Sequence, residues 1–349
     1  MKIYVNGRFL MHKQTGIERY AYEICRALAD KGVDLEVICP RTGAIDPAYD
    51  ISGIHITRFG IGHSHFWEQC ILPFFFLFVN APLLCLSGIS PVLVKNKITT
   101  IHDVSFLFRQ SWFSKLYANF YRIFTRLAVK TSKHVITVSE FSKSEILKYY
   151  GDIITPEKVS VVYGASKFNA SEFIPDTSSK MSDSFLSVAS FDPRKNLSIL
   201  EPAIAQIPGS QLYVVGWGNK VFANTTKAET EQIKYLGRVS DAVLANLYAT
   251  STALIFPSLY EGFGLPPIEA QMFGCPVLVS DIPVMHEVCG NSAIYFDPND
   301  AADLVDKMHY ILSISKEERD LIIEQGRKNA LRFSFGKSSE TLLSIIQNI

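Results

Sequence analysis

Several patterns that mark common protein classes are missing from this sequence of 349 residues. No two of its six cysteines form a C-x-x-C pair, so we expect free, mostly buried thiols in a reducing compartment rather than a disulfide or zinc framework. There is no D-x-D motif and no group of His and carboxylate residues with the spacing of metal ligands. We therefore expect no catalytic metal and no cofactor.

Long apolar runs are missing as well. The most apolar stretch, residues 71–94, is interrupted by prolines, an asparagine and a glycine, whereas a membrane-spanning helix needs about 20 nearly uninterrupted apolar residues. A predicted strand at residues 2–5 opens the chain, which leaves no room for the charged and apolar segments of a secretory signal. We expect a cytoplasmic protein without a transmembrane segment.

The chain has no excess of either charge overall, but its two halves differ. Residues 1–167 contain 20 Lys and Arg against 13 Asp and Glu, and the remaining residues contain 14 against 21. A basic first half suits an anionic partner, and scattered solvated charge explains the same numbers equally well.

Short apolar strands alternate with helical patterns along nearly the whole chain, which is typical of parallel sheets covered by helices on both faces. The first series of predicted strands comprises residues 2–5, 33–39, 98–101, 135–138 and 159–162. The second series comprises residues 185–188, 212–215, 233–236, 253–256, 277–279 and 293–296. Helices are predicted from about Gly16 to Asp30 and from an N-cap at Ser142 to just before Gly151. An aperiodic, serine-rich stretch, residues 164–183, is the predicted linker between two domains.

Two carboxylates, Glu261 and Glu269, flank a Gly-Phe-Gly loop and the start of a helix in the segment S-L-Y-E-G-F-G-L-P-P-I-E. The glycines let backbone N–H groups approach an anion, and a helix N-terminus adds partial positive charge. Carboxylates repel a phosphate, so they suit hydroxyl groups on either side of it. A nucleotide sugar, with a diphosphate between two hydroxyl-rich groups, satisfies both demands. The alternative is a packed strand-to-helix turn whose glutamates stabilise the helix dipole.

This segment resembles the E-x7-E signature of the family 4 retaining glycosyltransferases, and the likeness extends over nearly the whole chain. Further segments resemble the family in the expected order: N-G-R-F-L, T-G-I-E-R-Y, T-I-H-D-V-S-F, V-I-T-V-S-E-F-S, D-P-R-K-N-L and, after the signature, E-V-C-G-N-S-A-I-Y-F-D-P. The resemblance implies a GT-B fold, in which two doubly wound, Rossmann-like α/β domains face each other across a cleft. We place the acceptor-side domain at residues 1–165 and the nucleotide-sugar-binding domain at residues 166–334, with a helix at about 335–349 returning to the first domain.

The resemblance also implies roles for residues of the signature. Glu269 would accept hydrogen bonds from the nucleotide ribose, and Glu261 would hold hydroxyls of the donor sugar. Backbone amides between them would lie against the sugar and the diphosphate; these belong to Gly262, Phe263, Gly264 and Leu265.

Lys195, in the P-R-K-N segment, would neutralise the diphosphate as the leaving group forms, and its alternative role is that of a surface lysine near a helix start. The chain departs from the family here. Many members carry an Arg shortly after the first strand of this domain, where this sequence has Ala189 and Ser190. Arg194 is the candidate replacement for that charge.

Two candidates lie in the first half. Thr15-Gly16-Ile17 resembles the family's glycine loop, which implies that the Gly16 amide approaches the diphosphate from across the cleft, although Gly16 equally suits a plain helix start. His102 follows a predicted strand at its carboxyl end, where ligands bind in open α/β sheets, and the family implies that it faces the donor sugar near the anomeric carbon. Asp103 either orients this imidazole or caps a loop. The family also implies retention by front-face attack, with the acceptor proton passing to a donor phosphate oxygen.

Residues 104–139 contain no acidic residue. On a helix, the basic residues Lys115, Arg122, Arg126 and Lys130 fall on one face, and the apolar residues Leu116, Phe120, Ile123 and Leu127 fall on another. With Trp112, Phe113 and the phenylalanines of 74–76, such a helix suits an anionic membrane surface and a lipid-linked acceptor. The alternative is an ordinary domain helix with a solvated basic face.

From these patterns we predict a peripheral membrane hexosyltransferase that extends a lipid-linked oligosaccharide in bacterial surface polysaccharide synthesis, such as O-antigen, capsule or exopolysaccharide. GDP-mannose is the first donor, because T-G-I-E-R-Y, T-I-H-D and P-R-K-N look most like the mannosyltransferase branch. Three alternatives are a UDP-sugar donor, a GT-B epimerase of a UDP-sugar, and a non-catalytic nucleotide-sugar-binding subunit. We expect no nucleic-acid partner.

Overall fold

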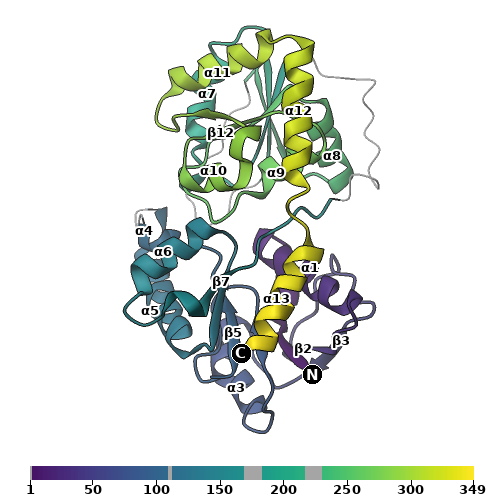
Figure 1. Cartoon of the computed structure of the whole chain (residues 1–349), viewed down its shortest axis with the longest axis vertical. Helices are drawn as coiled ribbons and strands as arrows, with labels where there is room; N and C mark the ends of the chain where they lie inside the picture. The colour runs from purple at the N-terminus through teal and green to yellow at the C-terminus, as the bar shows by residue number, and fades with distance from the viewer. Residues whose placement is uncertain (1, 109–111, 169–182, 217–229) are drawn as a thin grey trace. The chain divides into compact units, whose positions relative to one another are not determined.

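The computed structural model describes residues 2–108, 112–168, 183–216 and 230–349 (Figure 1). The chain divides into two compact units: Met1–Lys167 with Ser334–Ile349 form unit 1, and Phe168–Phe333 form unit 2. Each unit contains one parallel sheet, so the chain is α/β with two Rossmann-like domains, as predicted. Most of the predicted linker lies outside the described residues.

The unit 1 sheet has the order β3-β2-β1-β4-β5-β6-β7. Its strands are β1 Ile3–Asn6, β2 Leu35–Cys39, β3 His55–Arg58, β4 Leu83–Cys85, β5 Lys97–Thr100, β6 His134–Thr137 and β7 Val159–Val161. The sequence patterns missed β3 and β4. The first is a half-exposed edge strand, and the second has three residues inside the interrupted apolar stretch, so neither shows the apolar run or alternation on which the prediction depends.

The helical elements of unit 1 are η1 Gly7–Met11, α1 Gly16–Asp30, α2 Ser64–Phe66, η2 Trp67–Ile71, α3 Leu72–Phe75, α4 Ser105–Phe108, α5 Lys115–Thr131, α6 Glu140–Tyr150, η4 Pro156–Lys158 and α13 Phe335–Asn348. Helix α1 was predicted with its observed bounds. The predicted N-cap of α6 was wrong: Ser139 is the N-cap, and its hydroxyl oxygen accepts a hydrogen bond from the Ser142 N–H at 2.9 Å.

Helix α13, the yellow helix that ends at the C label in Figure 1, packs on α1 within unit 1. The Lys31 Nζ lies 2.8 Å from Glu340 Oε1, and the Ser338 hydroxyl donates to the Tyr163 carbonyl at 2.8 Å. The last helix of the chain is therefore part of the unit that contains the first strand.

The unit 2 sheet has the order β10-β9-β8-β11-β12-β13, the strand order of a dinucleotide-binding Rossmann sheet. Its strands are β8 Ser184–Val188, β9 Gln211–Val215, β10 Ile233–Gly237, β11 Ala253–Phe256, β12 Val277–Ser280 and β13 Ile294–Phe296. All six were predicted with each end within one residue. The helical elements are η6 Pro193–Lys195, η7 Leu197–Ile199, α7 Leu200–Ile204, α8 Asp241–Thr250, α9 Leu265–Met272, α10 Pro283–Cys289, η8 Gly290–Ser292, α11 Ala301–Ser313 and α12 Lys316–Ala330.

The unit 2 core lies between the sheet and helices α7 and α11. Phe185, Ile255 and Phe296 of the strands pack with Leu304 and Met308 of α11. Burial of each such side chain contributes about 1.5–3 kcal/mol, which fixes the strands whose carboxyl ends carry the candidate residues.

Two predictions from the sequence concern other features of the chain. Within the residues that the structure describes, no helix combines the length and the hydropathy required to span a membrane. All six cysteines, each of which is described, are free thiols; five are buried and Cys70 is exposed.

Candidate active site

The strand order of the unit 2 sheet reverses between its neighbours β8 and β11. Connections diverge at such a point and leave a crevice at the carboxyl ends of the strands, where ligands bind in open parallel sheets. The loop after β8 carries Arg194 and Lys195, and the loop after β11 carries Glu261. The Leu259 N–H donates a hydrogen bond to the Arg194 carbonyl at 2.9 Å, so the two loops are joined.

Lys195 and Glu261 form a direct ion pair at this edge of the sheet. The Lys195 Nζ lies 2.5 Å from Glu261 Oε1, and the two side chains are only 15% and 8% exposed. The ammonium also lies 5.7 Å from the ring centroid of Phe256, the last residue of β11, where the ring face attracts a cation. Desolvation offsets much of the attraction in such a pair, so its main consequence is that both side chains have a fixed position.

The segment Asp192-Pro193-Arg194-Lys195-Asn196 explains the position of Lys195. The Asp192 carboxylate caps the short helix η6 by accepting a hydrogen bond from the Arg194 N–H at 2.9 Å, and proline suits its first position. Asn196 ends the helix in the left-handed region, at φ 52°, and donates from Nδ2 to the Pro298 carbonyl at 2.7 Å. Lys195 is therefore held on both sides and is not the exposed surface lysine of the alternative.

Arg194 belongs to the same turn. Its Nε lies 3.4 Å from Asp192 Oδ2, so Asp192 compensates part of its charge locally. Sequence reasoning did not single out Asp192, although an aspartate before proline is a recognisable helix cap. That Arg194 replaces the missing family arginine stays a prediction.

The glycine loop between β11 and α9 requires a glycine at its end. Gly264 has φ +104°, and a Cβ there would lie 2.5 Å from the Met285 Cε atom. The preceding Phe263 is buried, and its ring packs edge-on against Phe333 at a centroid distance of 5.2 Å. The Phe263 side chain therefore anchors the loop, while Gly264 provides the backbone conformation that starts the helix.

Prolines limit the hydrogen-bond donors at the start of α9. The helix begins at Leu265 and continues with Pro266 and Pro267, which have no N–H groups. Its first turn thus offers fewer donors than most helix N-termini. An anion at this position would depend on the loop amides, which are those of Gly262, Phe263, Gly264 and Leu265.

Glu269 lies in α9 and is 8% exposed. Its Oε2 accepts a hydrogen bond from the Tyr248 hydroxyl of α8 at 3.0 Å. Burial and, after it, the nearby carboxylate of Glu269 hold the pKa of Tyr248 well above its usual range, so the phenol remains a donor at neutral pH. Tyr248 was missed from the sequence because the contact spans 21 residues and no motif announces it.

A buried amide network fixes α9 from the side of α12. The Gln271 Nε2 donates to the Ser292 hydroxyl at 2.8 Å, and the Asn329 Nδ2 donates to Gln271 Oε1 at 2.7 Å. Because Gln271 lies two residues after Glu269, this network limits movement of the helix that carries the second glutamate of the signature.

His102 lies in unit 1, two residues after β5. Its Nε2 donates to the Leu86 carbonyl at 2.9 Å, and its ring packs edge-on against Tyr20 at a centroid distance of 5.1 Å. A carbonyl only accepts, so Nε2 carries the proton and Nδ1 carries the lone pair of the neutral ring. Burial lowers the pKa of His102, which favours that neutral form at pH 7. The Asp103 carboxylate accepts from the Ser105 N–H at 2.8 Å, as a loop cap does.

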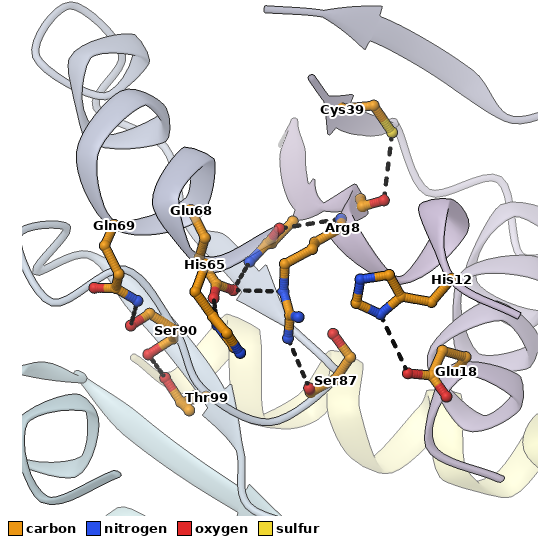
Figure 2. Close-up of polar contacts among 12 residues, drawn as sticks. Arg8, His12, Glu18, Cys39, His65, Glu68, Gln69, Ser87, Ser90 and Thr99 are labelled. Carbon is orange, nitrogen blue, oxygen red and sulfur yellow. Dashed lines mark hydrogen bonds and ion pairs between the residues drawn. The ribbon is translucent and has the colours of Figure 1, made fainter. Parts of the chain in front are cut away.

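Gly16 is the first residue of α1, and a Cβ there would meet nothing within 4 Å. The Glu18 carboxylate in the same helix turn accepts a hydrogen bond from Thr15 and pairs with His12 at 3.7 Å (Figure 2). Burial opposes ionisation of Glu18, but the hydrogen bonds of His12 and Thr15 outweigh it and lower the pKa of Glu18. This helix start therefore carries its own anion, and the predicted approach of Gly16 to a diphosphate stays a prediction.

Among the residues that the structure describes, no group of three or more His, Cys, Asp or Glu is arranged to hold a metal ion. The chemistry available in unit 2 is that of one largely buried ammonium, two buried carboxylates and a loop of backbone amides. This combination can bind an anion and hydroxyl groups side by side.

Comparisons with known proteins relate the chain to glycosyltransferases. The family "Glycosyltransferase Family 4" matches residues 14–165, and the family "Glycosyl transferases group 1" matches residues 171–329. The O-antigen chain mannosyltransferase RfbU of Salmonella typhimurium is 34% identical over 230 residues, which cover 64% of this chain and 63% of the relative. The chain thus spans just under two thirds of that protein's length.

Two further relatives extend the comparison. The O-antigen chain mannosyltransferase B of Escherichia coli is 28% identical over 262 residues, which cover 70% of this chain and 68% of the relative. The structure of Anabaena HepE in complex with UDP-glucose covers 100% of this chain and 99% of its own, with a TM-score of 0.77 at 16% identity. At that identity the likeness concerns the fold alone.

Proposed function

The chain belongs to the group 1 and family 4 glycosyltransferases and has their GT-B fold, and we propose that it transfers a hexose from a nucleotide sugar to a glycan acceptor. The observation that carries the proposal is the Lys195–Glu261 pair beside the glycine loop. A single edge of the unit 2 sheet then offers a cation for the diphosphate and carboxylates for hydroxyl groups.

In the proposed reaction the donor separates this ion pair. The diphosphate pairs with the Lys195 ammonium and accepts hydrogen bonds from the amides of the glycine loop. Hydroxyls of the sugar donate hydrogen bonds to the Glu261 carboxylate. Glu269, oriented by Tyr248, accepts from the ribose. Hydrogen bonds that involve a charged group contribute about 1.5–3 kcal/mol each, which suffices to replace the partners that the pair loses.

Bond cleavage leaves a nucleoside diphosphate with one additional negative charge. We propose that Lys195 and the loop amides stabilise that charge without a metal ion, since preorganised donors are most effective where charge develops. The acceptor hydroxyl attacks from the face of the leaving group and gives its proton to a phosphate oxygen, so the anomeric configuration is retained. His102 contacts the donor sugar through Nδ1, because its Nε2 is already used by Leu86.

GDP-mannose is our first proposed donor, and the mannosyltransferase relatives support it. Their role in O-antigen chains also supports a saccharide acceptor of a surface polysaccharide, which we propose is lipid-linked. The test is a panel of sugar nucleotides with the wild type, Glu261→Gln and, as a matched control, Glu317→Gln in the exposed first turn of α12. We expect the wild type and Glu317→Gln to transfer the sugar and Glu261→Gln to lose this activity. Transfer by Glu261→Gln at the wild-type rate would show that Glu261 is not part of the site. Incubation of the wild type with the donor alone tests the epimerase alternative, and we expect no epimer of the donor sugar.

We also propose that helix α5 contacts an anionic membrane. The helix packs on unit 1 through Ala118, Thr125, Ala128 and Val129. Leu116, Ile123 and Leu127 are instead 83%, 56% and 38% exposed, on a helix that also exposes its basic residues. An ordinary domain helix would bury this apolar stripe. Arg126 pairs with Asp152, so the proposal rests on Lys115, Arg122 and Lys130.

Vesicle co-sedimentation tests this contact. Vesicles of phosphatidylglycerol and phosphatidylcholine should bind the wild type, and binding should fall several-fold for Arg122→Glu with Lys130→Glu, because each basic residue near an anionic surface contributes about 1 kcal/mol. Lys316→Glu with Lys328→Glu in unit 2 is the matched control. Unchanged binding of the α5 variant would end the proposal.

A further inference from the structure

A buried polar network lies at the reversal of the unit 1 sheet, between β1 and β4. Arg8 follows β1, and its Nη2 donates to the Ser87 carbonyl after β4 at 3.4 Å. His102 donates to the neighbouring Leu86 carbonyl. Arg8 and His102 therefore hold the same short loop, at the sheet edge where this topology places ligands.

The centre of the network is the carboxylate of Glu68, whose side chain is completely buried. Its Oε1 accepts a hydrogen bond from Asn6 Nδ2 at 2.6 Å and lies 3.3 Å from Arg8 Nε. Its Oε2 lies 3.0 Å from His65 Nδ1 (Figure 2). One buried anion thus has an amide, a guanidinium and an imidazole as partners, and it links β1 to the helical segment before β4.

His65 is the member of this network that reaches the surface. Its side chain is 27% exposed, against 8% for Arg8. Because a carboxylate only accepts, His65 Nδ1 carries the proton, and in the neutral form of the ring Nε2 has a lone pair directed away from Glu68. The His65 ring lies against two aromatic rings of α5, Phe120 and Tyr121, at centroid distances of 5.2 and 6.3 Å.

The backbone around His65 is unusual. Ser64 has φ +48°, a region that costs a residue other than glycine about 1–3 kcal/mol. Glu68 lies in a π-helical turn, Trp67–Ile71, a rare form that is frequent at functional sites. Asn6 and Arg8 already provide partners for Glu68, so burial of this carboxylate does not by itself require a partly exposed imidazole. The arrangement instead orients the ring of His65.

We infer that His65 contacts the acceptor saccharide: its Nε2 accepts a hydrogen bond from a sugar hydroxyl, and the aromatic rings of α5 contact the apolar face of the sugar. Glu68 is a positioning residue that fixes the imidazole, and Arg8 and Asn6 hold Glu68. A polar atom of fixed direction beside aromatic surface is the combination that orients a ligand in a binding site. This inference rests on the proposed function and names the residue that meets its second substrate.

The experiment uses the full chain with GDP-mannose as donor and octyl α-D-mannopyranoside as the probe acceptor. For His65→Ala we expect the KM of the probe to rise about tenfold, the equivalent of one lost hydrogen bond of about 1.4 kcal/mol, while the KM of the donor changes less than twofold. His65→Gln, whose Oε1 can replace Nε2 as an acceptor, should recover part of the loss. His63→Ala, an exposed neighbour, is the matched control.

A second measurement separates this inference from the proposed function. Ring ¹⁵N signals of His65 are followed while the probe is added without donor, and a selective shift of Nε2 is expected. If no sugar nucleotide supports transfer, the proposed function is wrong. The titration still shows whether His65 contacts the saccharide probe. The inference is overturned by an unchanged Nε2 signal, or by His65→Ala with an unaltered probe KM or with donor and probe KM raised equally.

Discussion

The two units place a cation and a carboxylate at the same topological position but build the pair differently. Each sheet reverses between its first and fourth strands, and each first strand is followed by the cation, Arg8 in unit 1 and Lys195 in unit 2. In unit 2 both partners lie on loops at the carboxyl edge, and the pair is 15% and 8% exposed. In unit 1 the partner, Glu68, lies in a helical turn and is fully buried.

The two ion pairs suit different roles. Lysine is a compact, rotatable point charge, so Lys195 can exchange Glu261 for a phosphate with little rearrangement. Arginine is a rigid fork, and Arg8 is fixed by both Glu68 and Ser87. We therefore expect the unit 2 pair to separate when a ligand binds, and the unit 1 pair to persist and to support His65.

The largest expected effect concerns the permanence of the unit 1 pair. Arg8→Met leaves Glu68 buried without its cation and should lower the free energy of unfolding of unit 1 by about 3–5 kcal/mol. Arg8→Met with Glu68→Leu should recover much of that loss. Urea unfolding followed by tryptophan fluorescence checks both, since Trp67 is fully buried in unit 1. If Arg8→Met alone were as stable as the wild type, Arg8 would not be required as a permanent partner of Glu68, and the two units would not differ in this respect.

The next effect concerns the unit 2 pair. Lys195→Ala should lower kcat/KM for the donor about 10²–10³-fold, because the charge that develops on the leaving group loses its cation. The control is Lys316→Ala, an exposed lysine of α12, which should retain wild-type activity. Equal rates for Lys195→Ala and the control would show that the pair is merely structural.

Tyr248→Phe tests whether the second glutamate depends on its neighbour. The variant removes the donor to a buried carboxylate, so unit 2 should be destabilised by about 1.5–3 kcal/mol and the KM of the donor should rise several-fold. Tyr213→Phe, at a half-buried position of strand β9, is the matched control. A normal KM in Tyr248→Phe would mean that Glu269 is oriented without the phenol.

The smallest effect concerns Lys97, a lysine held by a carbonyl and a hydroxyl, whereas Lys195 pairs with a carboxylate. Lys97 of β5 is fully buried and donates to the Val94 carbonyl and the Thr131 hydroxyl, each at 2.7 Å. Burial lowers the pKa of Lys97 to about 8. Between pH 8 and its unfolded pKa of 10.5 the unfolded chain binds more protons, so stability rises with pH.

Comparison with Lys97→Met isolates this contribution from tyrosines that titrate in the same range in the unfolded chain. The stability of the wild type relative to Lys97→Met should increase by about 1–2 kcal/mol from pH 7.5 to pH 9.5. Urea midpoints at the two pH values measure it, and a difference independent of pH would place the Lys97 pKa at its ordinary value.

Local patterns predicted most of the fold. Apolar runs between turns located every unit 2 strand, including the partly exposed edge strands β10 and β13, whereas the edge strand β3 and the short strand β4 lack such runs. The predicted N-cap of α6 was Ser142 and the observed one is Ser139, because both serines suit a cap. Only the position at which the helix starts after β6 distinguishes them.

The sequence nominated individual residues of the candidate site, but it did not predict which of their side chains contact each other. Motifs nominated Lys195 and Glu261, yet their ion pair joins residues 66 positions apart and depends on the adjacency of β8 and β11. Likewise, nothing in the sequence links Glu68 to Arg8, since a buried pair between two elements leaves no spacing pattern. Long-range side-chain pairing is the information that the fold adds.

Analysis of the reaction product decides whether the chain transfers mannose with retention of configuration. The wild type is incubated with GDP-mannose and octyl α-D-mannopyranoside, and the product is identified by NMR of its anomeric proton. We expect release of GDP and a new α-linked mannoside, which is the retained configuration of the donor. The proposed retaining transfer would be contradicted by a β-linked product, by an epimerised donor, or by the absence of transfer from every sugar nucleotide in the panel.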